Sequence, residues 1–228
     1  MIQRALAALS LLLLLAGCGG PAAGGAGEQG TAQLWITRDR GAELILEAEV
    51  EAGQTLMRAL AAEAELETRY GGRYVQSVNG IAGSLEDQRD WFWFVNGYEG
   101  DRSASAYRLR AGDVAWLDYR PWQAEGEARV VVGAFPEPFL HGYAGKTRPA
   151  VVRYEQGIEP VAQRLAAELG DAPIATLDVP APEGANVLEV RVGSPSLVAE
   201  LLGETAGDPV RFVWRGDRIA LERRYEVP

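Results

Sequence analysis

Side chains able to do catalysis are scarce in this chain of 228 residues, which contains one histidine, His141. Any Ser-His-Asp or Cys-His arrangement would have to use that histidine. The Gly-x-Ser-x-Gly turn that presents a serine nucleophile is missing, because the segment Gly193–Leu197 lacks the second glycine. Carboxylate pairs such as Glu63 and Glu67 are typical of a solvated face in so acidic a chain. We therefore expect no catalytic residue and no enzymatic activity, with His141 in an ordinary loop.

Residues that could bind a metal ion, a cofactor or a nucleic acid are equally few. One cysteine and one histidine leave too few ligands for a zinc site. A single cysteine also excludes an intramolecular disulfide. The loop Asn96–Asp101 has oxygen ligands without the spacing of a Ca²⁺ loop. Neither Gly24-Gly25 nor Gly71-Gly72 is followed by the Lys-Ser/Thr of a phosphate-binding loop. With 22 basic and 32 acidic residues, a net charge of −10, the chain lacks the basic footprint that nucleic acids require. The sequence thus predicts no metal, no cofactor and no nucleic-acid partner.

Cys18 has the most specific chemical context in the chain. Arg4 supplies a positive start, and residues 5–15 form a largely apolar run. This run is too short to cross a hydrocarbon core about 30 Å thick, so it is typical of a signal peptide. The sequence Leu15-Ala16-Gly17-Cys18 resembles the lipobox of bacterial lipoproteins, in which the cysteine sulfur receives a diacylglyceryl group and becomes the first residue after cleavage. The alternative is a secretory signal that merely contains a cysteine.

This resemblance implies an anchor and a location for the rest of the chain. Residues 1–18 are the expected lipoprotein signal peptide, and residues 19–33, rich in Gly and Ala, are an expected flexible tether reaching about 20 Å. The membrane is then a partner through diacylglyceryl-Cys18, because two acyl chains give stable anchoring. We expect the folded part to lie at the cell membrane, lipid-anchored on the extracytoplasmic face.

Residues 34–122 alternate between strand and helix signals. Short β-rich runs at 34–41 and 43–50 predict a hairpin. Apolar residues at helical spacing predict a helix over about 55–67, opened by Gln54-Thr55. Three further strands are predicted, at 73–81, 91–98 and 114–120, with a shorter one before the Gly112-Asp113 turn; Asn-Gly pairs end the first two.

Four pieces of this region fall in the order of a known module: Glu51–Leu56, Val78–Gly80, Trp93–Gly97 and Leu109–Trp116. In this they resemble the transcobalamin-like C-terminal domain, a β-grasp family of uncharacterised function found in bacterial surface lipoproteins. The resemblance covers about residues 34–121. It implies a β-grasp fold that binds a soluble ligand, which in transcobalamins closes over a corrinoid held by a helical barrel. This chain is too short to contain such a barrel.

Residues 123–228 form a second expected unit, after a polar bridge at 123–127. We expect strands at 128–135, 150–156 and 186–193, a helix at 157–170, a short helix at 196–203 and a hairpin over 211–225. This order predicts a small two-layer α/β sandwich. The fold class expected for the whole chain is therefore α+β: an N-terminal β-grasp domain followed by the sandwich.

The aromatic strand WFWFVNGY supplies the candidate ligand-binding residues. Alternation along a strand places Trp91 and Trp93 on one face, with Phe92 and Phe94 on the other. A helix covers one face of a β-grasp sheet. We expect the phenylalanines beneath it and the tryptophans on the open face, since each indole N–H needs a partner. Such a platform suits a flat or sugar-like ligand. The alternative is packing of one face against the second unit. The candidate ligand-binding residues are Trp91, Trp93, Tyr98 and Trp122.

Two functions follow from these features. The first is a membrane-anchored, extracytoplasmic lipoprotein at the cell surface, related to cobalamin or vitamin uptake, that captures a small ligand or hands it to a transporter. The second is a cell-envelope lipoprotein with a structural or protein-interaction role and no small-molecule ligand. A concave aromatic pocket favours the first function, and a flat exposed patch favours the second.

Lipidation is tested at Cys18. In a bacterial host grown with a clickable palmitate analogue, the wild-type chain should be labelled, and Cys18→Ser should lose the label because no other thiol is available. Ser10→Ala, within the apolar run, is the matched control and should keep it. Unchanged labelling of Cys18→Ser would contradict the anchor.

Overall fold

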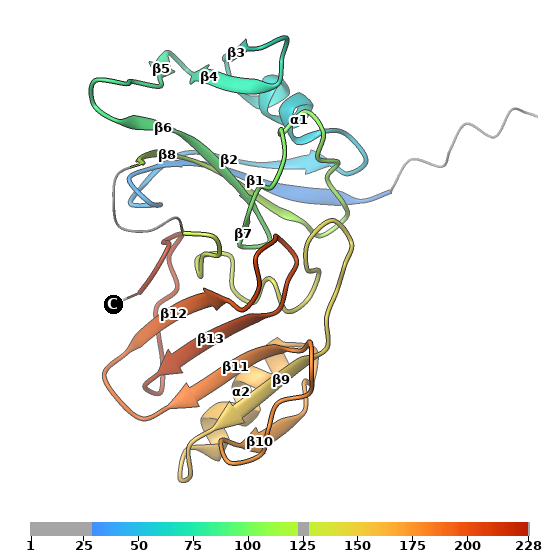
Figure 1. The fold of residues 1–228 in the computed structure, drawn as a ribbon, viewed down its shortest axis with the longest axis vertical. Coiled ribbons are helices and arrows are strands. Elements are labelled where there is room, and N and C mark those ends of the chain that lie inside the picture. The colour runs from blue at the N-terminus through green and yellow to red at the C-terminus, as the bar shows by residue number, and fades with distance from the viewer. Residues whose placement is uncertain (1–28, 123–127, 228) are drawn as a thin grey trace, which may run out of the picture.

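The computed structural model describes residues 29–122 and 128–227, as a mixed α+β fold with two five-stranded sheets and a smaller three-stranded one. In Figure 1 the two larger sheets lie one above the other, with α1 and the small sheet on the far side of the first sheet. Cys18, the signal peptide and residues 19–28 of the expected tether lie outside the described residues. Within the described ranges, none of the helices has the length and apolar character needed to cross a membrane.

The first half of the chain supplies one large sheet, one helix and the small sheet. Its elements are β1 (Thr31–Arg38), β2 (Glu43–Glu51), α1 (Leu56–Glu63), β3 (Leu66–Arg69), β4 (Tyr74–Val78), β5 (Ile81–Ala82), β6 (Arg89–Val95), β7 (Tyr98–Glu99) and β8 (Val114–Pro121). The large sheet has the order β2-β1-β8-β6-β7, and only β1 and β8 run parallel. The helix begins where the sequence predicts, with the Thr55 side chain accepting a hydrogen bond from the Arg58 N–H. It is shorter than predicted, because residues 66–69 form β3.

The second half supplies β9 (Ala150–Tyr154), α2 (Glu159–Glu168), β10 (Ile174–Thr176), β11 (Asn186–Arg191), β12 (Ser196–Leu201) and β13 (Val210–Arg215). The sheet order is β10-β9-β11-β13-β12, with β12 as the single antiparallel strand.

Three elements expected in this half are wrong. Residues 196–203 are not a helix: β12 pairs along β13, and Leu197 is buried while Val198 is exposed, which is the alternation of a strand. An apolar run this short fits the period of a helix as well as that of a strand, so hydrogen bonding to a neighbouring strand decides which of the two forms. Residues 128–135 form no strand, and residues 211–225 form no hairpin because no strand follows β13 among the described residues.

Residues 128–132 and the segment around Tyr225 lie against the first sheet instead. The Val131 N–H donates to the Gly97 carbonyl at 2.8 Å, and the Val132 N–H donates to the Tyr225 carbonyl at 3.0 Å. Figure 1 shows this part of the chain running between the two large sheets.

Asp118 of β8 holds this arrangement together from a fully buried position. One carboxylate oxygen accepts from the Thr37 hydroxyl and from the Gly41 N–H at 3.1 Å. The other accepts from the Arg40 N–H at 3.1 Å and from the Tyr225 hydroxyl at 2.9 Å. A buried carboxylate is stable only when its oxygens are paired in this way, so it ties β1, the β1–β2 turn and the Tyr225 segment to β8.

Both faces of β6 are covered, and the expected assignment of the faces is reversed. Phe94 packs against Trp116 and Tyr225, with ring centroids 6.0 and 5.1 Å apart. Trp91 lies on the opposite face, in the core that contains α1, and its indole N–H donates to the Ile81 carbonyl at 2.9 Å. The tryptophans therefore lie on the helix-covered side. The phenylalanines face the second half of the chain, because the Tyr225 segment covers them.

A second buried group lies where the loop after residue 132 meets the first sheet. Glu137 accepts from the His141 backbone N–H at 3.0 Å and contacts the His141 ring, and Asp113 accepts from the Asn96 side chain at 2.8 Å. Desolvation by burial raises the pKa of both the Asp113 and the Glu137 carboxyl groups.

Burial of Phe94 predicts a large stability effect. Phe94→Ala leaves a cavity under Trp116 and Tyr225, and it should lower the free energy of unfolding by about 3–5 kcal/mol in urea titrations. Leu85→Ala is the control and should cost almost nothing, because Leu85 is 86% exposed. Equal losses in the two variants would rule out this packing.

The raised pKa of Glu137 predicts a pH dependence. Above the ordinary glutamate pKa the native state holds a proton that the unfolded chain has released, so the free energy of unfolding falls as pH rises. Glu137→Gln cannot titrate and should lose part of this fall, measured by urea unfolding between pH 4 and pH 8. Glu86→Gln, in an exposed loop, should keep the wild-type slope. A Glu137→Gln slope equal to wild type would contradict the assignment.

Candidate functional site

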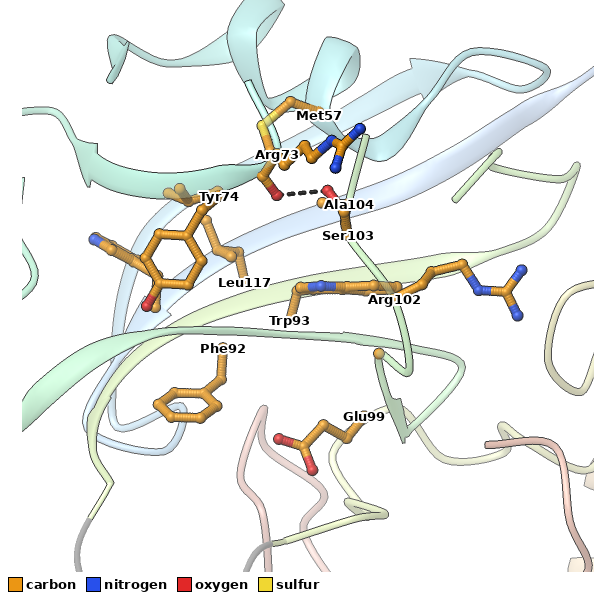
Figure 2. A pocket seen from close by; sticks show the side chains of 13 residues that line it. Met57, Arg73, Tyr74, Phe92, Trp93, Glu99, Arg102, Ser103, Ala104 and Leu117 are labelled. Atoms are coloured by element: carbon orange, nitrogen blue, oxygen red, sulfur yellow. Dashed lines mark hydrogen bonds between the residues drawn. The ribbon is translucent and has the colours of Figure 1, made fainter. Parts of the chain in front are cut away.

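A pocket of about 290 Å³ opens between α1, β6, the start of β4 and the loop after β7 (Figure 2). We call it the Trp93 pocket. Its lining residues are Met57, Arg73, Tyr74, Val75, Trp91, Phe92, Trp93, Glu99, Gly100, Arg102, Ser103, Ala104 and Leu117.

The Trp93 ring forms one wall of this pocket and is held in place by its neighbours. A Cβ atom at Gly100 would lie 2.1 Å from the indole ring, so only glycine lets the chain pass this close. Tyr107 contacts the ring edge-on, with centroids 5.5 Å apart. In Figure 2 the ring is seen edge-on, below Arg73 and Ser103 and beside Tyr74. An aromatic face thus borders the cavity in a fixed orientation.

The opposite wall is tied down by hydrogen bonds. The Ser103 hydroxyl donates to the Arg73 carbonyl, which joins the loop after β7 to the β3–β4 hairpin (Figure 2). The Tyr74 hydroxyl donates to Asp90. Burial, and then the Asp90 carboxylate, raise the pKa of the Tyr74 hydroxyl well above its ordinary value. Tyr74 therefore stays protonated and neutral at physiological pH.

The charged side chains of the pocket differ in their partners. Arg102 forms two hydrogen bonds with Asp101, at 2.7 and 3.0 Å. Glu99 contacts Arg120 at 3.5 Å, and in Figure 2 it lies on the other side of β6 from Arg73. Within the described part of the chain, no carboxylate lies within 4.0 Å of the Arg73 guanidinium.

A second pocket, of about 370 Å³, shares Tyr74 with the first, and we call it the Trp122 pocket. Its lining residues are Arg69, Tyr70, Tyr74, Gln76, Gly83, Ser84, Leu85, Asp90 and Trp122. Tyr70 is 78% exposed and Leu85 is 86% exposed, so this pocket sits within an open apolar patch.

The structure separates the four residues suggested by the sequence. Trp91 and Trp93 line the Trp93 pocket, although Trp91 is largely buried. Trp122 lines the other pocket. Tyr98 lines neither of the two: it is buried, and its hydroxyl donates to the Asp208 carbonyl at 2.9 Å, joining the two halves of the chain.

Sequence reasoning missed Arg73, Tyr74 and Ser103. The available signal was the repeated Arg-Tyr pair around the glycines in Arg69-Tyr70-Gly71-Gly72-Arg73-Tyr74. Tyr70, Gly71 and Gly72 all have positive φ, which makes a tight hairpin tip and places one Arg-Tyr pair on each side of it.

The site contains no arrangement typical of a metal centre. Across residues 29–122 and 128–227, no three or more His, Cys, Asp or Glu side chains are grouped so that they could hold a metal ion.

Comparisons with known proteins match part of the chain. Residues 53–120 match a family model described as a domain of unknown function (DUF4430). The search of curated proteins found no match. Among solved structures, a protein from Ruminococcus gnavus ATCC 29149, provisionally described as metal-binding, is 16% identical with a TM-score of 0.36, over 42% of this chain and 100% of its own. Haptocorrin in complex with Cbi is 15% identical with a TM-score of 0.35, over 41% of this chain and 25% of its own, so this chain spans a quarter of haptocorrin's length.

Proposed function

We propose that this protein is an extracytoplasmic lipoprotein, anchored in the cell membrane through Cys18, whose residues 34–122 form a transcobalamin-like β-grasp domain that binds a small, flat ligand in the Trp93 pocket. The observation that carries this proposal is the half-buried Trp93 ring. It borders a cavity of about 290 Å³ and is held by Gly100 and Tyr107. A fixed aromatic wall with polar groups at the rim is the usual composition of a ligand pocket.

The size of the cavity narrows the ligand class. Ligand pockets span about 300–1,000 Å³, so a cavity at the lower end of this range suits a ligand of one or two rings. A larger cofactor such as a corrinoid would place only one edge inside it. The resemblance to transcobalamin-like domains supports a corrinoid or another vitamin as ligand, with a membrane transporter receiving it.

A second candidate function rests on the Trp122 pocket. Tyr70, Leu85 and Trp122 are exposed on one side of the first sheet, and exposed apolar side chains gathered in one patch are typical of protein contacts. A cell-envelope interaction protein would use this patch and would need no small ligand.

Ligand binding is tested with the full chain in detergent and 2-naphthylmethanol, a neutral two-ring probe, by equilibrium dialysis. Wild type should bind it saturably. Trp93→Ala should weaken binding about tenfold or more, because stacking on one aromatic side chain contributes about 1–3 kcal/mol. Partition into detergent is common to all variants and cancels in the comparison.

Trp122→Ala is the matched control and should keep wild-type affinity, since Trp122 lies in the other pocket. Trp93→Ala should also destabilise the fold less than Phe94→Ala. Loss of binding in Trp122→Ala alone would favour the exposed patch. Absence of saturable binding to wild type would contradict the proposal.

A further inference from the structure

We infer that the ligand of the Trp93 pocket is a flat monoanion, a ring system that carries one carboxylate, and that Arg73 is the side chain that recognises its charge. This inference rests on the proposed function and adds the chemical class of the ligand.

The first support is the pairing of arginines across the molecule. Eleven arginines form ion pairs with carboxylates in the described part of the chain, as the excess of acidic over basic residues allows. Arg73, like Arg58 and Arg69, has no such partner there, but unlike those two it lines the Trp93 pocket. Its guanidinium therefore places an uncompensated positive charge at the rim of a pocket, although the chain as a whole carries a net charge of −10.

The second support is the neutralisation of the other charges. Arg102 is occupied by Asp101, and in Figure 2 its guanidinium points away from Tyr74 and the interior of the pocket. Glu99 contacts Arg120 on the far side of β6. Arg73 is therefore the one charged lining residue that forms no ion pair within the described residues. One cation matches one negative charge, which favours a carboxylate over a phosphate dianion.

The third support is the way the backbone of Arg73 is held. The Ser103 hydroxyl binds its carbonyl, and its N–H donates to the Arg69 carbonyl at 3.1 Å. The side chain itself is exposed. A fixed backbone with an exposed guanidinium presents a planar fork that can form two parallel hydrogen bonds with a carboxylate.

The experiment compares three probes of one shape on the full chain in detergent: 2-naphthoate, 2-naphthylmethanol and 2-naphthylmethylammonium. At low salt, wild type should bind the anion about three- to tenfold more tightly than the alcohol and should bind the ammonium most weakly. Arg73→Gln should weaken binding of the anion much more than binding of the alcohol, so that the advantage of the anion is lost. Arg73→Lys should retain part of the advantage, since it keeps the charge and loses the planar fork.

Arg58→Gln is the matched control, because Arg58 is an exposed arginine of α1 that does not line the pocket. It should keep the preference for the anion, and thermal unfolding should confirm that every variant is folded. Equal wild-type affinities for the three probes, all weakened by Trp93→Ala, would overturn this inference while the proposed function stands. A preference for the anion that survives in Arg73→Gln would also overturn it. Failure of all three probes to bind wild type would overturn both.

Discussion

The buried carboxylate of Asp118 is the constraint on which the rest of this structure depends. Its two oxygens accept four hydrogen bonds, from Thr37, from the backbone of Arg40 and Gly41, and from Tyr225. An unpaired carboxylate in this position would be costly, so all four donors must be in place together. The Asp118 carboxylate thus fixes the β1–β2 turn against β8 and holds the Tyr225 segment, which is distant in the sequence, against the first sheet.

The hydrogen bonds of Asp118 also determine what covers each face of β6. The Tyr225 segment fills the Phe94 face, and Arg120 stacks above Phe92 with 4.2 Å between its Cζ atom and the ring centroid. On the Trp93 face the covering elements are the short helix α1 and the small sheet, which do not reach the end of the strand. The remaining space, between the hairpin tip and the loop that contains Ser103, is the cavity.

Local sequence signals predicted much of the first half and less of the second. The alternation that separates Trp93 from Phe94 and the start of α1 depend on neighbouring residues, and the structure has both where they were expected. Which face each aromatic set occupies depends on Tyr225, far along the chain, so alternation alone could not decide it. Residues 196–201 fit a helix or a strand until β13 pairs with them. The role that we propose for Arg73 could not be predicted from the sequence for a similar reason, because it depends on which carboxylates lie near the guanidinium in the folded chain.

The separation between Asp118 and Tyr225 has a consequence for how the chain reaches this structure. These residues are 107 positions apart. Until the Tyr225 segment is in place, the Asp118 carboxylate lacks one of its donors and the Phe94 ring has no cover from that segment, even when every strand of the first sheet has paired. The first sheet alone is therefore an incomplete folding unit with an apolar face exposed, and its completion depends on a residue from the other half of the chain.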